Sequence, residues 1–304
     1  MISIFICTYN RGELIDGTLR AIIEGQRRKP DEIVVVNGGG AHDCSPILDR
    51  WKEVFPTLRE IKTQNVNLAT SRNLGLPQCK GDIIIQTDDD AEPFPDWIER
   101  LEEEHRNHPE AGVIGGNVVD ASGEGLLFKI ADAMTFTHFE GIGPVETRTV
   151  PGVNSSYKRE VIEKVGAYDT VMFRGEDVDY NWRCIKAGYK VLSFPDIKVY
   201  HHHRATWKGL YNQQYMYGRA YLLVRRKWKN MYCVYPHGIH RLRDVAKFGF
   251  FCIVPWIDQA HKLKYVKGFW NKIVAYPIML TINYNWHRGV ITQYFIERKK
   301  KHGK

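Results

Sequence analysis

The chain has 304 residues, of which 43% are hydrophobic and 26% charged, and its formal net charge at pH 7 is +8. This length allows one large core or two smaller ones, and the composition is ordinary for a globular protein. The six cysteines form no CxxC pair, which argues against a zinc or disulfide framework and favours a reducing, cytoplasmic compartment. Residues 1–8 carry no basic leader, so we expect them to form a strand and not a signal peptide.

Charge is distributed unevenly along the chain. Residues 201–304 contain 20 Lys and Arg against 3 Asp and Glu, whereas residues 1–200 contain 23 against 32. The last third also holds 20 of the 37 aromatic residues. We therefore predict a boundary near Arg204, between an acidic α/β body and a basic, aromatic C-terminal region.

Short apolar runs alternate with helical stripes in the body. Strands are expected at 2–7, 32–36 and 83–85, where the apolar runs are short and end in turn residues, and a further strand is expected around 58–62. Apolar residues at helical spacing predict helices at 15–23 and 47–55. This alternation of strand and helix indicates an α/β fold, with a mostly parallel sheet covered by helices.

Three consecutive acids, Asp88, Asp89 and Asp90, follow the strand at 83–85. Ligands of open α/β sheets bind at the carboxyl ends of the strands. Hard oxygen ligands in such a place suit Mg²⁺ or Mn²⁺, together with the phosphates of a substrate. The alternative is a solvated acidic turn before the helix that begins near Pro95, and the other motifs of the chain favour the metal site.

Polar residues follow the other strands at the same predicted edge. They are Thr8, Asn10, Arg11, Asn37 and Arg72. We predict a nucleotide site in which the first two strand ends contact base and ribose, Arg11 or Arg72 contacts phosphate, and the acids hold a bridging cation. The triple glycine at 38–40 matches neither GxGxxG nor a P-loop, so dinucleotide-binding and kinase functions are not supported.

Two further groups of polar residues stand near the end of the body. Glu176 and Asp177 precede a predicted helix, where the helix dipole stabilises carboxylates, so simple capping is the alternative to a functional role. A strand pair or one broken strand, at 190–194 and 197–200, is followed by three histidines. Three adjacent residues cannot all face one ion, but alternation allows His201 and His203 on one side.

Several motifs, in this order, resemble family 2 glycosyltransferases of the GT-A fold. They are Ile4-Phe-Ile-Cys-Thr-Tyr-Asn-Arg11, Asp31-Glu-Ile-Val-Val-Val36, Asn67-Leu-Ala-Thr-Ser-Arg-Asn-Leu-Gly75, Gly81-Asp-Ile-Ile-Ile-Gln-Thr-Asp-Asp-Asp90, Pro151-Gly-Val-Asn-Ser-Ser156, Gly166-Ala-Tyr-Asp169 and Gly175-Glu-Asp-Val-Asp-Tyr-Asn-Trp-Arg183. The resemblance covers residues 2 to about 204. It implies a GT-A catalytic domain at 1–204, with nucleotide-sugar binding in 1–120 and the acceptor and catalytic part in 121–204. The implied activity is sugar transfer from a nucleotide-sugar with inversion.

The resemblance also implies roles for individual residues. Asp177 would be the catalytic base, and Glu176 would orient it or bind acceptor hydroxyls beside Asn154. Asp88 and Asp90 would hold Mn²⁺ or Mg²⁺, while Asp89 would contact the ribose or the sugar. His201 or His203 would complete the metal site or contact the diphosphate, the alternative being a packed or solvated histidine cluster.

One position departs from the pattern of the family. The second strand of family members usually ends in an acid that accepts a hydrogen bond from the base, and Asn37 stands there in this chain. An amide can accept and also donate, which leaves uridine, thymidine and guanosine donors open, with a UDP-sugar preferred.

The basic region at 205–304 contains a predicted amphipathic helix at 211–228 and two apolar stretches, 248–257 and 273–282, interrupted by Pro255 and Pro277. A membrane-spanning helix needs about 20 apolar residues, so we predict none. Cationic helices with interleaved aromatic residues are typical of in-plane association with an anionic membrane. The alternatives are a helical subdomain packed on the sheet and a nucleic-acid surface, of which we do not expect the second.

These observations lead to one main hypothesis. The protein is expected to be a metal-dependent, inverting glycosyltransferase that moves a sugar to a glycan or lipid-linked glycan in surface polysaccharide synthesis, in the cytoplasm or on the inner face of the plasma membrane. Two alternatives are a sugar nucleotidyltransferase, whose lysine-bearing glycine loop is not found in the sequence, and a nucleotide-sugar binding module without transfer activity. The acids after Gly175 argue against the second.

Overall fold

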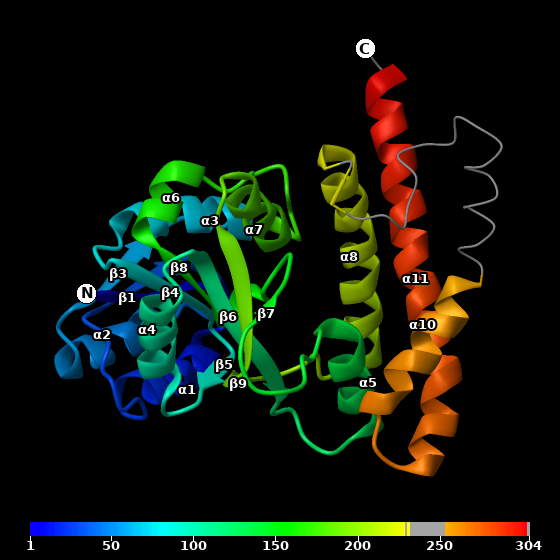
Figure 1. Cartoon of the computed structure of the whole chain (residues 1–304), viewed down its shortest axis with the longest axis horizontal. Coiled ribbons are helices and arrows are strands. Elements are labelled where there is room, and N and C mark those ends of the chain that lie inside the picture. The colour runs from blue at the N-terminus through cyan, green and yellow to red at the C-terminus, as the bar shows by residue number, and fades with distance from the viewer. Residues whose placement is uncertain (229, 232–252, 303–304) are drawn as a thin grey trace. The chain divides into compact units, whose positions relative to one another are not determined.

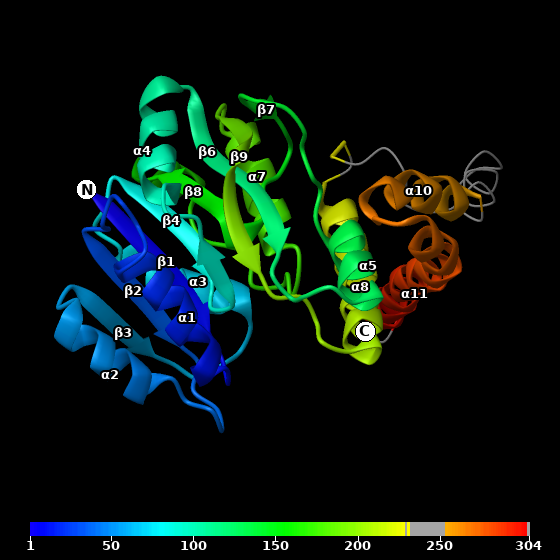
Figure 2. The same cartoon turned by 90° about the horizontal axis from the view of Figure 1, so that it is seen from below.

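The computed structural model describes residues 1–228, 230–231 and 253–302, and the chain divides into two compact units. The first unit contains Met1–Ala121 and Thr137–His202, and the second contains Ser122–Phe136 and His203–Lys304. Both units are drawn in Figures 1 and 2. The segment Ser122–Phe136 thus belongs to the same unit as the C-terminal helices, although it precedes much of the first unit in the chain.

The strands are β1 (Ile2–Thr8), β2 (Glu32–Asn37), β3 (Leu58–Lys62), β4 (Ile83–Asp88), β5 (Ala91–Pro93), β6 (Ala111–Asp120), β7 (Val145–Glu146), β8 (Ser155–Lys158) and β9 (Lys190–His201). The helices of the first unit are α1 (Gly12–Ile23), α2 (Ser45–Val54), α3 (Leu68–Gly75), η1 (Leu76–Gln78), α4 (Trp97–Asn107), η2 (Gly152–Asn154), α6 (Arg159–Val165) and α7 (Glu176–Lys186). Those of the second unit are α5 (Leu126–Thr135), α8 (Trp207–Lys227), α10 (Val254–Lys262), η3 (Leu263–Tyr265) and α11 (Phe269–His302).

The described part of the first unit is built on one nine-stranded sheet, in the order β3-β2-β1-β4-β8-β6-β9-β5, with β7 paired to β9. The four strands β3, β2, β1 and β4 are parallel, as the sequence predicts. Beyond them β8 runs antiparallel to both β4 and β6, while β6 and β9 pair in parallel, so the sheet is mixed but most of its strands point the same way. Hydrophobic periodicity cannot distinguish the two pairings, because side chains alternate between the faces in either case.

The central strands are buried on both faces because their residues are aliphatic without interruption. One face of the sheet, which includes Phe5, Val34 and Ile84, packs against Ala69 of α3 and Tyr180 of α7. Figure 1 shows α3, α6 and α7 on this side of the strands, and α1, α2 and α4 on the other. Helices on both faces leave the ends of the strands as the places where polar side chains can gather.

The region at 190–201 forms one strand, β9, with an irregularity in its middle. Its register with β6 shifts between Gly116 and Asn117, and the side chain of Asn117 donates a 3.1 Å hydrogen bond to the carbonyl of Pro195. Proline cannot donate to the ladder, which accounts for an interruption at this point. The strand then continues to His201, which pairs with Ala91 of β5.

The second unit packs α5, α8 and α11 around a small apolar core. Ile130 of α5, Leu210 of α8 and Met279 of α11 are buried in it. The helices α8 and α11 lie close together (Figure 1). Gly218 and Gly289 permit this close packing, since a side chain at either position would meet the backbone of the other helix. Among the described residues, no helix is both long and apolar enough to cross a membrane.

The two predicted apolar stretches of this unit differ in what the structure shows of them. Pro277 was expected to interrupt its apolar stretch, but α11 continues through it from Phe269 to His302. Proline removes one backbone hydrogen bond, and the packing of the following turns keeps the helix continuous. Of the other predicted stretch, residues 248–252 lie outside the described residues, and 254–257 begin α10.

The buried His105 of α4 makes the stability of the fold depend on pH. Its ring is 4% exposed and its Nε2 lies 2.8 Å from the hydroxyl of Ser156. Burial lowers the pKa of His105 from 6.5 to about 3. Below pH 6.5 the unfolded chain therefore binds a proton that the folded protein does not, so stability present at neutral pH is lost as the pH falls. Between pH 7 and pH 5 this residue should reduce the free energy of unfolding by about 2 kcal/mol.

Urea unfolding of the wild type and His105→Gln at the two pH values measures this contribution. The drop in unfolding free energy should be about 2 kcal/mol smaller in the variant than in the wild type. His42→Gln is the matched control, since residue 42 is exposed, and its drop should equal that of the wild type. An equal drop in His105→Gln would show that the ring is not kept neutral by burial.

Candidate active site

The carboxyl ends of three parallel strands bring the predicted nucleotide residues to one edge of the sheet. Thr8 at the end of β1 pairs with Asn37 at the end of β2, and Cys7 pairs with Asp88 at the end of β4. Thr8, Asn37 and Asp88 therefore stand at nearly the same level. This is the edge at which open α/β sheets bind ligands.

Asp88, Asp90 and His201 form a group that could hold a metal ion. Each offers one ligand atom, and these atoms lie within 4.8 Å of one another. The Nε2 of His201 is 3.4 Å from a carboxylate oxygen of Asp90, because β5 and β9 pair Ala91 with His201. The pairing of two distant strands thus adds an imidazole to the two carboxylates.

The residues of this group fit a divalent cation. Burial, together with the charge of Asp90, raises the pKa of Asp88 above its ordinary value. A bound cation would offset both the burial and the repulsion. Carboxylate oxygens are ligands of Mg²⁺ and Mn²⁺, and imidazole is the commonest metal ligand of proteins.

His203, the other predicted histidine, lies in the second unit. It is 7% exposed, and its Nε2 lies 3.4 Å from Asp132 of α5. Its ring also lies near that of Phe136, with 5.8 Å between the centroids. The structure therefore groups only the first of the two predicted histidines with the aspartates within one unit.

Asp89 contacts different partners from its two neighbours. Its carboxylate accepts a 2.6 Å hydrogen bond from Thr8 and lies 3.1 Å from Nη1 of Arg11. The same Nη1 is 2.5 Å from Asp90, so Arg11 bridges two acids of the aspartate triplet, Asp88–Asp90. Burial raises the pKa of Asp89 to about 7, although Arg11 and Thr8 favour its charged form. The positive charge that the triplet needs is thus supplied in part by the protein.

Arg72 and Glu176 form a buried ion pair at the start of α7. Their side chains are 3% and 5% exposed, and Nη1 of Arg72 lies 2.7 Å from Oε1 of Glu176. Burial alone would lower the pKa of Arg72, but Glu176 and the other acidic groups around it together outweigh burial, and the pKa lies above its ordinary value. The guanidinium predicted to contact phosphate is therefore held by α7 in this structure.

Asp177, the predicted base, lies beside this pair and is only half-buried. Its Oδ2 accepts a 3.2 Å hydrogen bond from the amide of Gly152, and its Oδ1 accepts one of 2.8 Å from Val178. The carbonyl of Gly152 in turn accepts a 3.1 Å hydrogen bond from Gln86 of β4. Gln86 stands two residues before Asp88, so Asp177 lies on the same side of the sheet edge as the triplet.

Gly152 occupies a confined position beside Arg72 and Asp177. A Cβ atom there would lie 2.7 Å from Nη2 of Arg72 and 3.4 Å from Oδ2 of Asp177. A side chain at this position would therefore displace the guanidinium of Arg72 from its present place. Gly152 belongs to one of the motifs found in the sequence. Its spatial neighbours could not be predicted, because all of them are distant in the chain.

Asn37 is buried, and both ends of its amide are occupied. Its Nδ2 donates to Asp43 at 2.6 Å and to Glu60 at 2.8 Å, while its Oδ1 accepts from the amide of Gly39 at 2.8 Å. Two carboxylates therefore stand next to the position where the sequence lacks an acid. Asp43 and Glu60 carry no recognisable motif in the sequence, because one lies in a glycine-containing loop and the other is an ordinary polar position of β3.

Two other predicted contact residues also serve the fold. Asn10 has a backbone φ of 57°, and its Oδ1 accepts a 2.9 Å hydrogen bond from the amide of His42, which ties the loop after β2 to β1. Asn154, predicted to bind the acceptor, is 0% exposed. Its amide donates to the carbonyls of Asn117 and Ile197 and accepts from the indole of Trp97.

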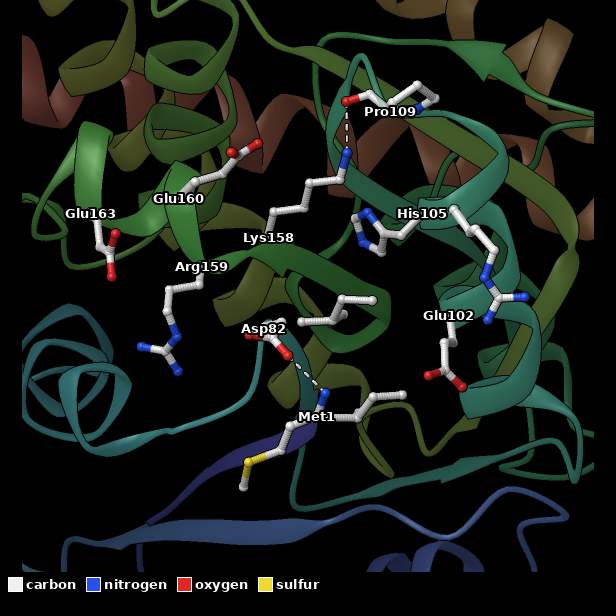
Figure 3. Close-up of a pocket in the computed structure, with 12 residues that line it drawn as sticks. Met1, Asp82, Glu102, His105, Pro109, Lys158, Arg159, Glu160 and Glu163 are labelled. Carbon is white, nitrogen blue, oxygen red and sulfur yellow. Dashed lines mark hydrogen bonds and ion pairs between the residues drawn. The ribbon is translucent and has the colours of Figure 1, made fainter.

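A cavity of about 720 Å³ lies at the opposite end of the strands. It is lined by Met1 and Ile2 at the start of β1 and by Asp82 and Ile83 at the start of β4. Figure 3 shows the ion pair between Met1 and Asp82, at 2.8 Å, and the hydrogen bond from Lys158 to the carbonyl of Pro109. No predicted site residue lines this cavity, so its volume does not mark the candidate active site.

The sequence of this chain matches a known protein family. The profile of the glycosyl transferase family 2 matches residues 3–166, which is more than half of the chain. The chain belongs to glycosyl transferase family 2. The matched residues contain β1 to β8 and the aspartate triplet, and the GT-A fold and family expected from the motifs are confirmed.

Relatives of this family 2 chain span several activities. The glucosyl-dolichyl phosphate glucuronosyltransferase of Haloferax volcanii is 30% identical over 181 residues, which are 56% of this chain and 56% of that protein. The poly-beta-1,6-N-acetyl-D-glucosamine synthase of Staphylococcus aureus is 25% identical over 225 residues, 70% of this chain and 52% of that one. The chain thus spans about half the length of these two relatives.

Among solved structures, this family 2 chain is similar to a mannosyltransferase of Pyrobaculum calidifontis in complex with GDP-Man and Mn²⁺. The TM-score is 0.64 at 17% sequence identity, and the match covers 96% of this chain and 86% of the other. The likeness establishes the fold.

Proposed function

We propose that this protein is a metal-dependent, inverting glycosyltransferase that moves a sugar from a nucleotide-sugar, preferably UDP-linked, to a glycan or lipid-linked glycan acceptor. The observation that supports it is the position of Asp177. This half-buried carboxylate is linked through Gly152 and Gln86 to the strand that ends in Asp88. A base and a cation site on one side of the sheet edge are what transfer from a nucleotide-sugar requires.

In the proposed reaction, Asp177 accepts the proton of an acceptor hydroxyl as its oxygen attacks the anomeric carbon from the face opposite the nucleotide. A new glycosidic bond forms while the bond between the anomeric carbon and the diphosphate oxygen breaks, so the configuration inverts. Asp88, Asp90 and His201 would hold the cation, whose chemistry is to neutralise the charge of the departing diphosphate. Thr8 and Arg11 position Asp89 beside this site.

The nature of the acceptor rests on the relatives and on the charge of the chain. One relative is named for a dolichyl phosphate substrate and another for a polysaccharide product. The positive charge of residues 201–304 is complementary to anionic lipids and lipid phosphates. We therefore include peripheral association with the inner face of the plasma membrane in the proposal, with residues 205–304 as the part that binds.

A panel of nucleotide-sugars tests the transfer proposal. UDP-, dTDP- and GDP-sugars, including GDP-mannose, would be screened for thermal stabilisation and for slow hydrolysis in Mn²⁺, Mg²⁺ or EDTA. At least one donor should bind only with the divalent cation. The proposal would be abandoned if no donor on the panel bound, or if binding were the same in EDTA.

Asp90→Asn should remove this cation dependence. The amide keeps an acceptor for Arg11 but lacks the charge of a carboxylate ligand, so donor affinity in Mn²⁺ should fall at least tenfold, or by about 1.4 kcal/mol. Glu99→Ala, at an exposed position of α4, is the control and should bind like the wild type. Titration calorimetry with the best donor measures both, and wild-type affinity in Asp90→Asn would remove this residue from the metal site.

A further inference from the structure

The long helix α11 is apolar on two opposite sides. Ala275, Met279 and Ile282, at i, i+4 and i+7, face the core of the second unit and are fully buried. On the opposite side lie Trp270, Val274 and further exposed apolar residues that recur at helical spacing. A contiguous apolar surface that stays exposed marks a place where a protein binds a partner or a membrane.

Exposure on this outer side is large for such side chains. Trp270 is 76% exposed, Val274 50% and Ile273 50% near the start of α11. Tyr284 is 41% exposed and Phe295 53% further along it. Positions 270, 274, 284 and 295 fall within about one third of the helix circumference at 100° per residue, so they form one stripe along the helix.

The neighbouring helix α10 extends this stripe. The indole of Trp256 donates a 2.9 Å hydrogen bond to the hydroxyl of Tyr284, and the hydroxyl of Tyr276 donates one of 3.1 Å to the carbonyl of Trp256. Trp256 itself remains 50% exposed and Ile257 62%. We call the exposed residues Trp256, Ile257, Trp270, Ile273, Val274, Tyr284 and Phe295 the aromatic face.

Cationic residues accompany the aromatic face. Lys264 and Lys267 are exposed in the segment between α10 and α11, and Arg288 is exposed within α11 itself. The helix then ends in a basic run that begins with the exposed Arg298 and Lys299. Exposed apolar side chains with Lys and Arg beside them are the pattern of a helix that lies in a membrane interface.

The aromatic face could be covered by a second copy of this chain or by a lipid surface, and electric charge favours one of the two. A second copy of this chain would bring together two regions that each carry 20 Lys and Arg against 3 Asp and Glu. Anionic phospholipid has the opposite charge, and each Lys or Arg near such a surface contributes about 1 kcal/mol of attraction. The lipid surface is the complementary partner.

We propose that the aromatic face binds to a membrane that contains anionic phospholipids, with α10 and α11 parallel to its plane. The apolar side chains enter the boundary between headgroups and acyl chains, while Lys264, Lys267, Arg288 and the basic end of α11 contact the phosphates. This inference rests on the membrane association proposed above and is independent of sugar transfer.

Vesicle sedimentation of the full chain tests the inference. The wild type should bind vesicles of phosphatidylcholine with 30% phosphatidylglycerol, and at least tenfold more weakly to phosphatidylcholine alone. Ile273→Asp/Val274→Asp should weaken binding to the anionic vesicles at least tenfold. The matched control is Val54→Asp/Val66→Asp, which changes two aliphatic residues that are 62% and 70% exposed in the first unit and should bind within twofold of the wild type.

Each other outcome contradicts the inference. If the Ile273→Asp/Val274→Asp variant bound anionic vesicles like the wild type, the association would be electrostatic only and the aromatic face would have no part in it. If the wild type failed to bind vesicles and was a dimer that this variant converted to a monomer, a second copy would cover the face. Nucleotide-sugar binding measured without vesicles on the same samples checks folding, and its failure alone would affect only the proposed transfer.

Discussion

Asp177→Asn should reduce the rate of sugar transfer by roughly 10²–10⁴-fold, the usual contribution of a general base. The amide has nearly the shape of the carboxylate but cannot accept the proton of the acceptor hydroxyl. Donor binding should stay within about twofold of the wild type, because the groups proposed to bind the donor lie at the ends of the strands and not at the start of α7. The expected signature is therefore loss of turnover without loss of donor affinity.

The hydrogen bonds of Asp177 make a measurement of stability necessary in this experiment. Its two oxygens accept from the amides of Gly152 and Val178, and an asparagine would turn its NH₂ group toward one of these donors. One lost or unmade hydrogen bond costs about 1–3 kcal/mol of stability, so melting of the variant must be measured beside its activity. Asp49→Asn, whose side chain is 68% exposed on α2, is the matched control and should transfer sugar like the wild type. Wild-type turnover in Asp177→Asn would mean that another group is the base.

Arg72→Met should destabilise the protein by about 3–5 kcal/mol, the cost of leaving a buried charge without its partner. Arg72 and Glu176 lie 2.7 Å apart with their side chains 3% and 5% exposed, so water cannot replace the lost guanidinium. The ring of Tyr168, 5.2 Å from the guanidinium, would lose a cation–π contact as well. The free energy of unfolding in urea measures the effect.

A double variant separates the charge effect from lost packing. Arg72→Met/Glu176→Leu removes both charges and should be clearly more stable than Arg72→Met alone, because buried ion pairs can often be replaced by apolar residues at little cost. Arg20→Met is the surface control: its partner Asp16 lies 3.0 Å away, but the arginine is 63% exposed, and such pairs contribute at most about 1 kcal/mol. Equal losses in Arg72→Met and Arg20→Met would show that burial does not strengthen the first pair.

Local patterns were enough to predict most of the first unit. Aliphatic runs predicted β1, β2 and β4 because a strand buried on both faces can carry few polar residues. The acids at 88–90 were found because they follow an apolar run directly, and the start of α7 at Glu176 was found because acidic residues precede a helical stripe. The antiparallel placement of β8 was not predicted, since side chains alternate in the same way in both pairings.

Contacts between the site residues were much less predictable. Either Arg11 or Arg72 was expected to contact phosphate, but their protein partners were not predicted: Arg11 lies between Asp89 and Asp90, and Arg72 pairs with Glu176. Asp43 and Glu60 surround Asn37 without any motif that marks them. In each case strand register and the path of a loop bring the partners together. Neither hydrophobic periodicity nor residue type reveals the register or the loop path.

The sequence by itself determined the family, the main strands and the chemical character of the residues that follow them, because each depends on neighbours along the chain. Only the tertiary structure decided which charges meet, that His201 joins Asp88 and Asp90, and that α11 keeps a second apolar side exposed. The physical reason is that pairing and packing between distant segments fix distances of a few ångströms, whereas local sequence fixes only the direction in which each side chain leaves its own strand or helix.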